Sequence, residues 1–165
     1  MLRRMLALAA FLFAPSFSFA GFEEDYELKN WREIEVQMPA GPKTENLIPF
    51  YVSAATDHKF FIDASSLSVG ADGVVRYIMV IQTSGGARNI SFEGMRCQTR
   101  EKRVYAFGRS DGSWSKSRSN QWDTVRQLDV NRQHAALFLE HFCPGGVIVA
   151  KVEEALRSLR QAAGM

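Results

Sequence analysis

The stretch SFEGMRC, residues 91–97, reads as the end of a β-strand that stops at Cys97, one of only two cysteines in the chain. Apolar and polar residues alternate through this strand, with Ile90 and Phe92 set against Asn89, Ser91 and Glu93. Such alternation is expected of a strand with one face on a core and the other in water. A strand that ends at a cysteine also raises the question of what this cysteine does.

Four more segments carry the β-branched and aromatic composition of strands. They are LIPFYVSA (47–54), KFFID (59–63), VVRYIMVIQT (74–83) and KRVYAFG (102–108). The third is apolar at almost every position, so we expect both of its faces to be covered. Short connections with turn residues, such as Asp72–Gly73, separate the segments, whereas parallel strands need long crossovers. The sequence therefore predicts an antiparallel meander.

After Trp122 the pattern changes to a helical period. In NRQHAALFLEHFCPGG (131–146), one apolar stripe is formed by Ala135, Phe138, Leu139 and Phe142. A second stripe is formed by Val149, Val152, Leu156 and Leu159, after ProGlyGly has ended the first helix. We predict an α+β fold in which an antiparallel sheet of about five strands carries two C-terminal helices packed on it.

The N-terminal twenty residues have the pattern of a secretory signal peptide. Arg3 and Arg4 precede an apolar run from Met5 to Ala14, and Ser18 and Ala20 are the small residues of a cleavage site. The apolar run is shorter than the roughly 20 residues that span a bilayer, although an uncleaved anchor is the alternative. We predict cleavage near Ala20, with residues 1–20 as signal peptide, and a mature chain that is exported to the periplasm and soluble. No later segment is apolar for long enough to form a transmembrane helix.

Composition argues against a nucleic-acid partner. The chain holds 20 Lys+Arg and 18 Asp+Glu, so removal of Arg3 and Arg4 leaves 18 of each sign. A nucleic-acid-binding domain normally has a clear basic excess. Acidic residues nevertheless outnumber basic ones in residues 22–72, and basic residues outnumber acidic ones in residues 96–126. This uneven charge distribution has two explanations. Both regions are solvated faces, or the basic region forms a face that binds an anionic partner.

Export bears directly on the two cysteines, because disulfides form and persist outside the reducing cytosol. Cys97 and Cys143 allow one pairing, which we predict as a disulfide that ties the sheet to the first C-terminal helix. Two alternatives remain, free thiols and a catalytic cysteine. A catalytic cysteine needs a base close by, and His141 would point elsewhere on a helix. Zinc is disfavoured because neither CxxC nor HxxxH spacing occurs.

No other pattern predicts a reaction centre, a metal site or a cofactor. His134 and His141 are two helical turns apart, which is too far for one ion, and we expect both at the surface or at an interface. The chain lacks the GxSxG motif of many serine hydrolases. Asp63 and Asp72 lack the spaced oxygen ligands of a calcium loop. We therefore predict no catalytic, cofactor-binding or metal-binding residue.

Several motifs, in this order, resemble the cryptic neisserial protein-like (CNP-like) family. They are WREIE (31–35), FIDASSLSVGADGVVRY (61–77), SGGARNISFEGMRC (84–97), YAFGRSDGSW (105–114) and FCP (142–144). The resemblance covers most of the mature chain and implies one CNP-like domain over residues 21–165, with a core at about 31–160. It also implies a small exported envelope protein of Gram-negative bacteria with no established activity. It supplies no catalytic residue.

One segment, GRSDGSWSKSRSNQWDTVR (108–126), combines basic and aromatic residues in the way a binding surface can. Basic groups hydrogen-bond phosphates or carboxylates, and indoles stack on sugars. The candidate residues are Arg109, Trp114, Lys116, Arg118, Trp122 and Arg126. The alternative is a solvated loop whose two tryptophans cover the edge of the sheet.

Two functions from different classes remain. The first is a non-enzymatic envelope module that binds an envelope protein or an anionic glycan, and it predicts no buried cluster of polar groups. The second is a small periplasmic hydrolase, which predicts that His58, or His134 with Glu140, meets a serine or a carboxylate in a cleft. A third possibility is an assembly factor that acts by contact alone.

Overall fold

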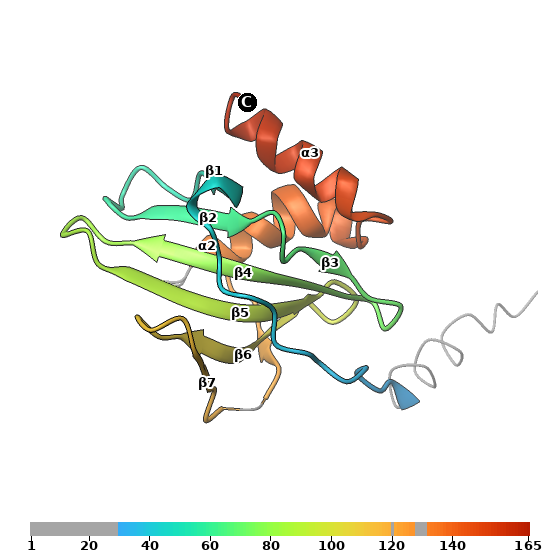
Figure 1. Ribbon diagram of the computed structural model, residues 1–165. Helices are drawn as coiled ribbons and strands as arrows, with labels where there is room; N and C mark the ends of the chain where they lie inside the picture. Colours follow the sequence, from blue (N-terminus) through green and yellow to red (C-terminus); the bar gives the residue numbers. More distant parts are fainter. Residues whose placement is uncertain (1–29, 120, 128–131) are drawn as a thin grey trace, which may run out of the picture. The chain divides into compact units, whose positions relative to one another are not determined.

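The computed structural model describes residues 30–119, 121–127 and 132–165 (Figure 1). The predicted signal peptide lies outside these residues. The chain divides into two units between Glu33 and Ile34, and the fold below is that of residues 34–165. No helix in the described ranges is long and apolar enough to cross a membrane.

One antiparallel sheet forms the body of this unit. Its main path is β1-β2-β4-β5-β6-β7, so neighbours in sequence are mostly neighbours in the sheet. The strands of this path are β1 (Leu47–Phe50), β2 (Lys59–Asp63), β4 (Val74–Gln82), β5 (Arg88–Arg96), β6 (Glu101–Gly108) and β7 (Trp114–Lys116). A 3₁₀ turn, η1 (Thr44–Asn46), leads into β1. The predicted meander is confirmed.

The prediction of about five strands was too low, because the sheet has eight. The three additional strands are β3 (Ser68–Val69), which pairs with β4, then β7, and β8 (Asp123–Thr124), which pairs with β6. Each has two or three residues, too few for a period of two to be visible in the sequence. The predicted strand 47–54 also ends early, at Phe50.

Strands β4 and β5 form the centre of the sheet, and both of their faces are covered. Tyr77 of β4 lies opposite Glu93 of β5, next to a bulge between Phe92 and Glu93. The prediction that Ser91 and Glu93 face water was wrong, because only 8% and 2% of their surfaces are exposed. Polar alternation along a strand says which residues share a face, but not whether another element covers that face.

The C-terminal helices pack together against one face of the sheet (Figure 1). They are α2 (Arg132–Ala136), a π-helical turn η2 (Leu137–Phe142), a 3₁₀ turn η3 (Pro144–Gly146) and α3 (Val152–Ala162). In the π turn the Cys143 amide donates to the Phe138 carbonyl, five residues back. This wider turn rotates the apolar stripe, so Leu137 is fully buried whereas Leu139, predicted to be in the core, is 45% exposed.

The two faces of the sheet carry separate hydrophobic clusters. The larger cluster lies under the helices and includes Ile62, Tyr77, Met79, Leu137 and Phe142. The smaller cluster is built on Ile78, Val80, Phe92 and Tyr105, with Val36 and Trp114 packed against it. The segment that precedes β1 is held at this second face, since the Trp114 indole donates a 2.8 Å hydrogen bond to the Pro39 carbonyl.

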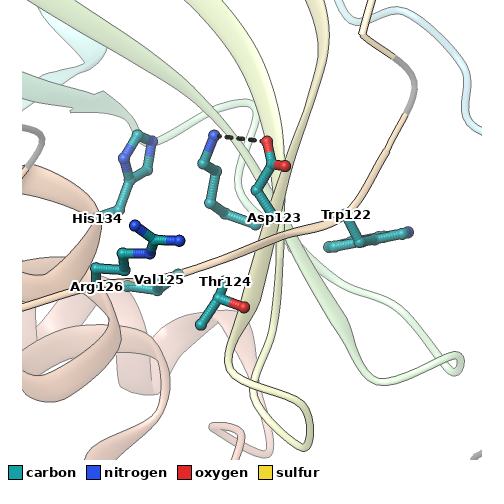
Figure 2. Close-up of a pocket in the computed structure, with 7 residues that line it drawn as sticks. Trp122, Asp123, Thr124, Val125, Arg126 and His134 are labelled. Carbon is teal, nitrogen blue, oxygen red and sulfur yellow. Dashed lines mark hydrogen bonds and ion pairs between the residues drawn. The ribbon is translucent and has the colours of Figure 1, made fainter.

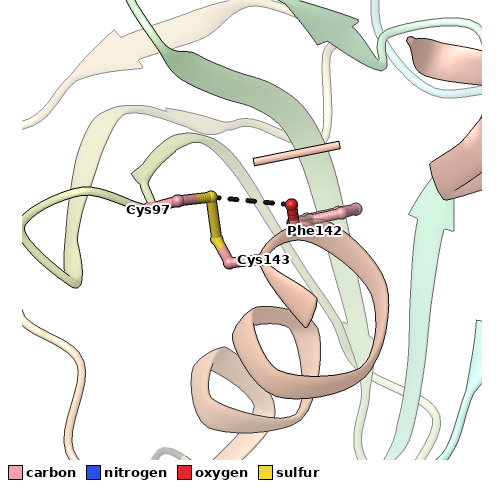
Figure 3. Close-up of a disulfide and its surroundings, with 3 residues drawn as sticks. All are labelled: Cys97, Phe142 and Cys143. Atoms are coloured by element: carbon pink, nitrogen blue, oxygen red, sulfur yellow. Dashed lines mark hydrogen bonds between the residues drawn. A yellow bond between two sulfur atoms is a disulfide. The ribbon is translucent and has the colours of Figure 1, made fainter. Parts of the chain in front are cut away.

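The predicted disulfide between Cys97 and Cys143 is confirmed (Figure 3). Its sulfur atoms are 2.04 Å apart, and both residues are buried, Cys97 just after β5 and Cys143 at the end of the π turn. Both cysteines are used, so neither is a free thiol or a nucleophile. The stretch SFEGMRC (91–97) therefore ends at a covalent link between the sheet and its helical layer.

Candidate binding site

A buried carboxylate, Glu93, accepts three hydrogen bonds on the helix-covered face of the sheet. The Tyr77 hydroxyl donates to Oε2 at 3.1 Å, and the Ser91 hydroxyl donates to Oε1 at 2.6 Å. From α2, Nε2 of His134 lies 2.7 Å from Oε2. This cluster connects two central strands to the first helix through polar groups that are nearly all withdrawn from water.

The partners of Glu93 favour its ionised form. Burial alone would raise the pKa of Glu93, but the charge and hydrogen bond of His134, with the hydrogen bonds from Ser91 and Tyr77, lower the pKa below its usual value. Burial, together with the negative charge of Glu93, raises the pKa of Tyr77 well above its usual range. The Tyr77 phenol therefore remains a hydrogen-bond donor to the carboxylate over the whole physiological pH range.

The two helical histidines are buried, so their predicted place at the surface was wrong. His134 is 7% exposed and His141 is 2% exposed. One ring nitrogen of His134 is engaged by Glu93, and its Nδ1 is buried with no hydrogen-bond partner in the described part of the chain. Neither nitrogen of His134 is thus presented to solvent for proton transfer.

His141 contacts a serine, in an arrangement that does not activate the hydroxyl. Nδ1 of His141 lies 2.8 Å from the Ser158 hydroxyl, which itself donates to the Glu140 carbonyl at 3.0 Å. Because the hydroxyl proton goes to the carbonyl, the imidazole donates to Ser158 and does not accept from it. Burial lowers the pKa of His141, which keeps the ring neutral. The pair joins the π turn to α3.

A pocket of about 420 Å³ opens beside His134, between the start of β6, strand β8 and α2 (Figure 2). Its lining residues are Lys102, Trp122, Asp123, Thr124, Val125, Arg126 and His134. In Figure 2, Arg126 and His134 lie at one end of this row, and Trp122 lies at the other, beyond Asp123 and Thr124. We call this cavity the β8 pocket.

The described residues that line the β8 pocket carry more positive than negative charge. Lys102 and Arg126 supply two cations, and Asp123 supplies one carboxylate, 3.3 Å from the Lys102 amine. The Asp123 side chain is 57% exposed, and such solvated ion pairs contribute only about 0–1 kcal/mol, so Lys102 can exchange this partner for a ligand. Arg126 is exposed and makes no ion pair with any described residue. The two cations suit an anionic group of a ligand, and the indole of Trp122 suits the flat apolar face of a ring.

The structure brings together two of the six candidate surface residues. Trp122 and Arg126 line the β8 pocket, whereas Trp114 packs on Phe92 with ring centroids 6.2 Å apart. Arg109 reaches the Ser115 hydroxyl at 3.3 Å. The remaining two, Lys116 and Arg118, are exposed near the end of β7 and line none of the pockets described here.

Three residues of this region were not singled out by sequence reasoning. Tyr77, Glu93 and Lys102 lie inside strands, where they were interpreted as ordinary strand positions. Of these three residues, only Glu93 had a signal in the sequence, because its carboxylate lies in a predicted strand that ends at Cys97. Within the described ranges no group of three His, Cys, Asp or Glu side chains could hold a metal ion. Asp63 instead accepts from Ser65, and Asp72 pairs with Arg76.

Comparison with known proteins finds similarity in sequence but no matching solved structure. The chain is similar to Cryptic neisserial protein 1 of Neisseria gonorrhoeae, with 24% identity over 86% of this chain and 77% of that protein. No solved structure matches the fold. Residues 26–160 match the CNP1-like family. This range includes all the strands described above and nearly all of the helices α2 and α3. The chain therefore belongs to the CNP1-like family.

Proposed function

We propose that this protein is an exported envelope module that binds an anionic glycan in the β8 pocket and catalyses no reaction. The observation that carries the proposal is that Trp122, Arg126 and Lys102 all line one cavity of about 420 Å³. Cavities of roughly 300–1,000 Å³ hold small ligands or single sugar units. An indole at one end of a cavity and cations along it suit a sugar that carries carboxylates or phosphates.

Export is supported by the sequence of residues 1–20 and by the disulfide, which requires an oxidising compartment. A periplasmic location follows from this proposal, and it places the β8 pocket among the charged glycans of the envelope. An acidic envelope protein is the competing partner. The glycan is favoured because Trp122 supplies a flat face and because the pocket is concave and not an extended patch.

A hydrolase is the second candidate, because the buried cluster of Glu93 and His134 is the kind of polar pair that it predicts. The binding module predicted no buried polar cluster, and that expectation was wrong. The hydrolase ranks second on the geometry of the imidazole. Nε2 of His134 is held by the carboxylate, and Nδ1 is buried, so no basic nitrogen reaches a substrate in the pocket. The pair serves better to position one wall of the pocket.

Photo-crosslinking in intact cells tests the proposal. A benzophenone amino acid replaces Thr124, which is exposed and lines the pocket. The same group at exposed Glu45, outside this lining, is the control. We expect glycan-bearing adducts from position 124 only. Adducts that form equally at both positions, or uncrosslinked monomer alone, would contradict the proposal.

A further inference from the structure

A second pocket, of about 460 Å³, lies between the loop that joins β1 to β2, the neighbouring ends of β4 and β5, and the start of α2. Its apolar lining includes Val52, Phe60 and Ile81, and its polar lining residues are Ser53, Thr56, His58, Asn89, Arg132 and Gln133. None of these residues lines the β8 pocket. Gln133 and His134 are successive residues of α2, so this helix contributes to both cavities.

Gln133 is the most informative residue of the second pocket. The residue as a whole is 7% exposed, but its amide atoms are not among the fully buried polar atoms that lack a partner. Gln133 lines the cavity, and no described side chain or backbone group forms a hydrogen bond with its side-chain amide. The amide is therefore free to hydrogen-bond a ligand in the cavity.

The charges around the pocket select the kind of partner. Arg132 is exposed and forms no ion pair with a described residue, and no Asp or Glu side chain is among the described residues of the lining. A guanidinium and an amide can both donate to one carboxylate. The side chains of Val52, Phe60 and Ile81 add an apolar surface to the same cavity, which suits a ligand whose other part is apolar.

We propose that the second pocket binds an amphiphilic carboxylate. Its apolar tail covers Phe60 and Ile81, and its carboxylate accepts hydrogen bonds from Arg132 and Gln133. This site is separate from the proposed glycan site, because the two cavities share no lining residue. Each proposal can therefore fail without the other.

Titration of the exported, disulfide-bonded protein with octanoate tests this inference, with octylammonium as the matched cationic probe. Chemical shifts of the Gln133 side-chain amide report the site, and the Trp122 indole reports the β8 pocket. We expect octanoate to shift the Gln133 amide saturably and to leave Trp122 unchanged, and octylammonium to do neither. Equal binding of both probes, shifts at Trp122 alone or no shift at all would overturn the proposal.

Two variants separate the ligand contacts from folding. Arg132→Gln removes the charge of an exposed side chain, and we expect octanoate affinity to fall about tenfold or more, as for loss of a charged hydrogen bond. Gln133→Leu keeps the volume, and a loss of about three- to tenfold is expected. Arg118→Gln, at an exposed position outside the pocket, is the control. Wild-type octanoate affinity in Arg132→Gln would overturn the assignment.

Discussion

Nε2 of His134 and Oε2 of Glu93 lie 2.7 Å apart, and the two side chains are 9% and 3% exposed. The contact joins α2, a helix of only five residues, to the central strand β5. Such a short helix has little stability of its own, so its position depends on tertiary contacts. This one pair therefore fixes α2, which supplies different lining residues to the two cavities.

Loss of the Glu93 carboxylate should be strongly destabilising. We expect Glu93→Ala to lower the free energy of unfolding by about 3–5 kcal/mol, because it leaves His134 and the Tyr77 hydroxyl buried without their acceptor. Urea denaturation measures the change. Glu45→Ala, at an exposed position, is the control and should change stability by at most about 0.5 kcal/mol. A loss below about 1 kcal/mol for Glu93→Ala would contradict the role given to this pair.

The disulfide should account for a large part of the stability. The link spans 46 residues, for which the chain-entropy relation gives about 4 kcal/mol. We expect Cys97→Ala, Cys143→Ala and the double variant to lose similar amounts, since each removes the same link. Denaturation of the oxidised and reduced proteins measures the loss. Unequal single variants, or a wild type that unfolds identically with and without reductant, would count against this account.

Stability should decrease as the pH falls below about 6.5, the usual pKa of histidine. Burial depresses the pKa of His141, so the unfolded chain binds a proton more readily than the folded chain does, and acid favours unfolding. His141→Asn preserves a donor to Ser158 and cannot titrate. We expect this variant to lose the pH dependence between about pH 7 and 5.5. A wild-type slope in His141→Asn would assign the effect elsewhere.

A further decrease is expected as the pH falls below about 4.5, the usual pKa of glutamate. The pKa of Glu93 is lowered in the folded state, so its contribution is complete above the unfolded value and is lost as the pH falls toward the folded value. This second decrease should be absent in Glu93→Gln. Protonation of His141 and protonation of Glu93 both lower stability as the pH falls. The variants His141→Asn and Glu93→Gln separate the two contributions.

Gly94 should tolerate no side chain, because Tyr105 lies across it. A Cβ at position 94 would lie 2.9 Å from the ring carbon Cζ of Tyr105, and the ring is packed against Phe92. We expect Gly94→Ala to cost about 1–3 kcal/mol of stability through overpacking. Gly85→Ala, where the nearest atom is 3.9 Å away, is the matched control and should be close to neutral. Equal effects at the two positions would contradict the packing described here.

The strands and the disulfide could be predicted because their signals are local. Runs of β-branched residues, turn residues between them and two cysteines in a chain with a predicted signal peptide were sufficient. The covered face of β5 could not be predicted, because Ser91 and Glu93 become buried only when α2, some 40 residues later, packs on them. The π turn was missed for a related reason. A period of 3.6 was assumed for Leu139, and the actual turn is wider.

The candidate site was only partly visible in the sequence. Trp122 and Arg126 were found through their composition, since basic and aromatic residues together suggest binding. Lys102 was hidden in β6 and joins them only through the pairing of β6 with β8. Conversely, Trp114 shared the same composition but packs on Phe92 in the second core cluster. Composition indicates a segment, whereas the sheet decides which of its residues meet.

Tryptophan fluorescence titration tests the central proposal, glycan binding in the β8 pocket, most directly. The disulfide-bonded protein is titrated with soluble peptidoglycan fragments and with lipopolysaccharide core oligosaccharide, and neutral dextran oligosaccharides serve as the control ligand. We expect a saturable response to an anionic glycan that is absent in Trp122→Phe. In Arg126→Gln the affinity should be about tenfold or more weaker, and Arg118→Gln should bind like the wild type. No saturable response to either anionic glycan, or wild-type affinity in Arg126→Gln, would contradict the account.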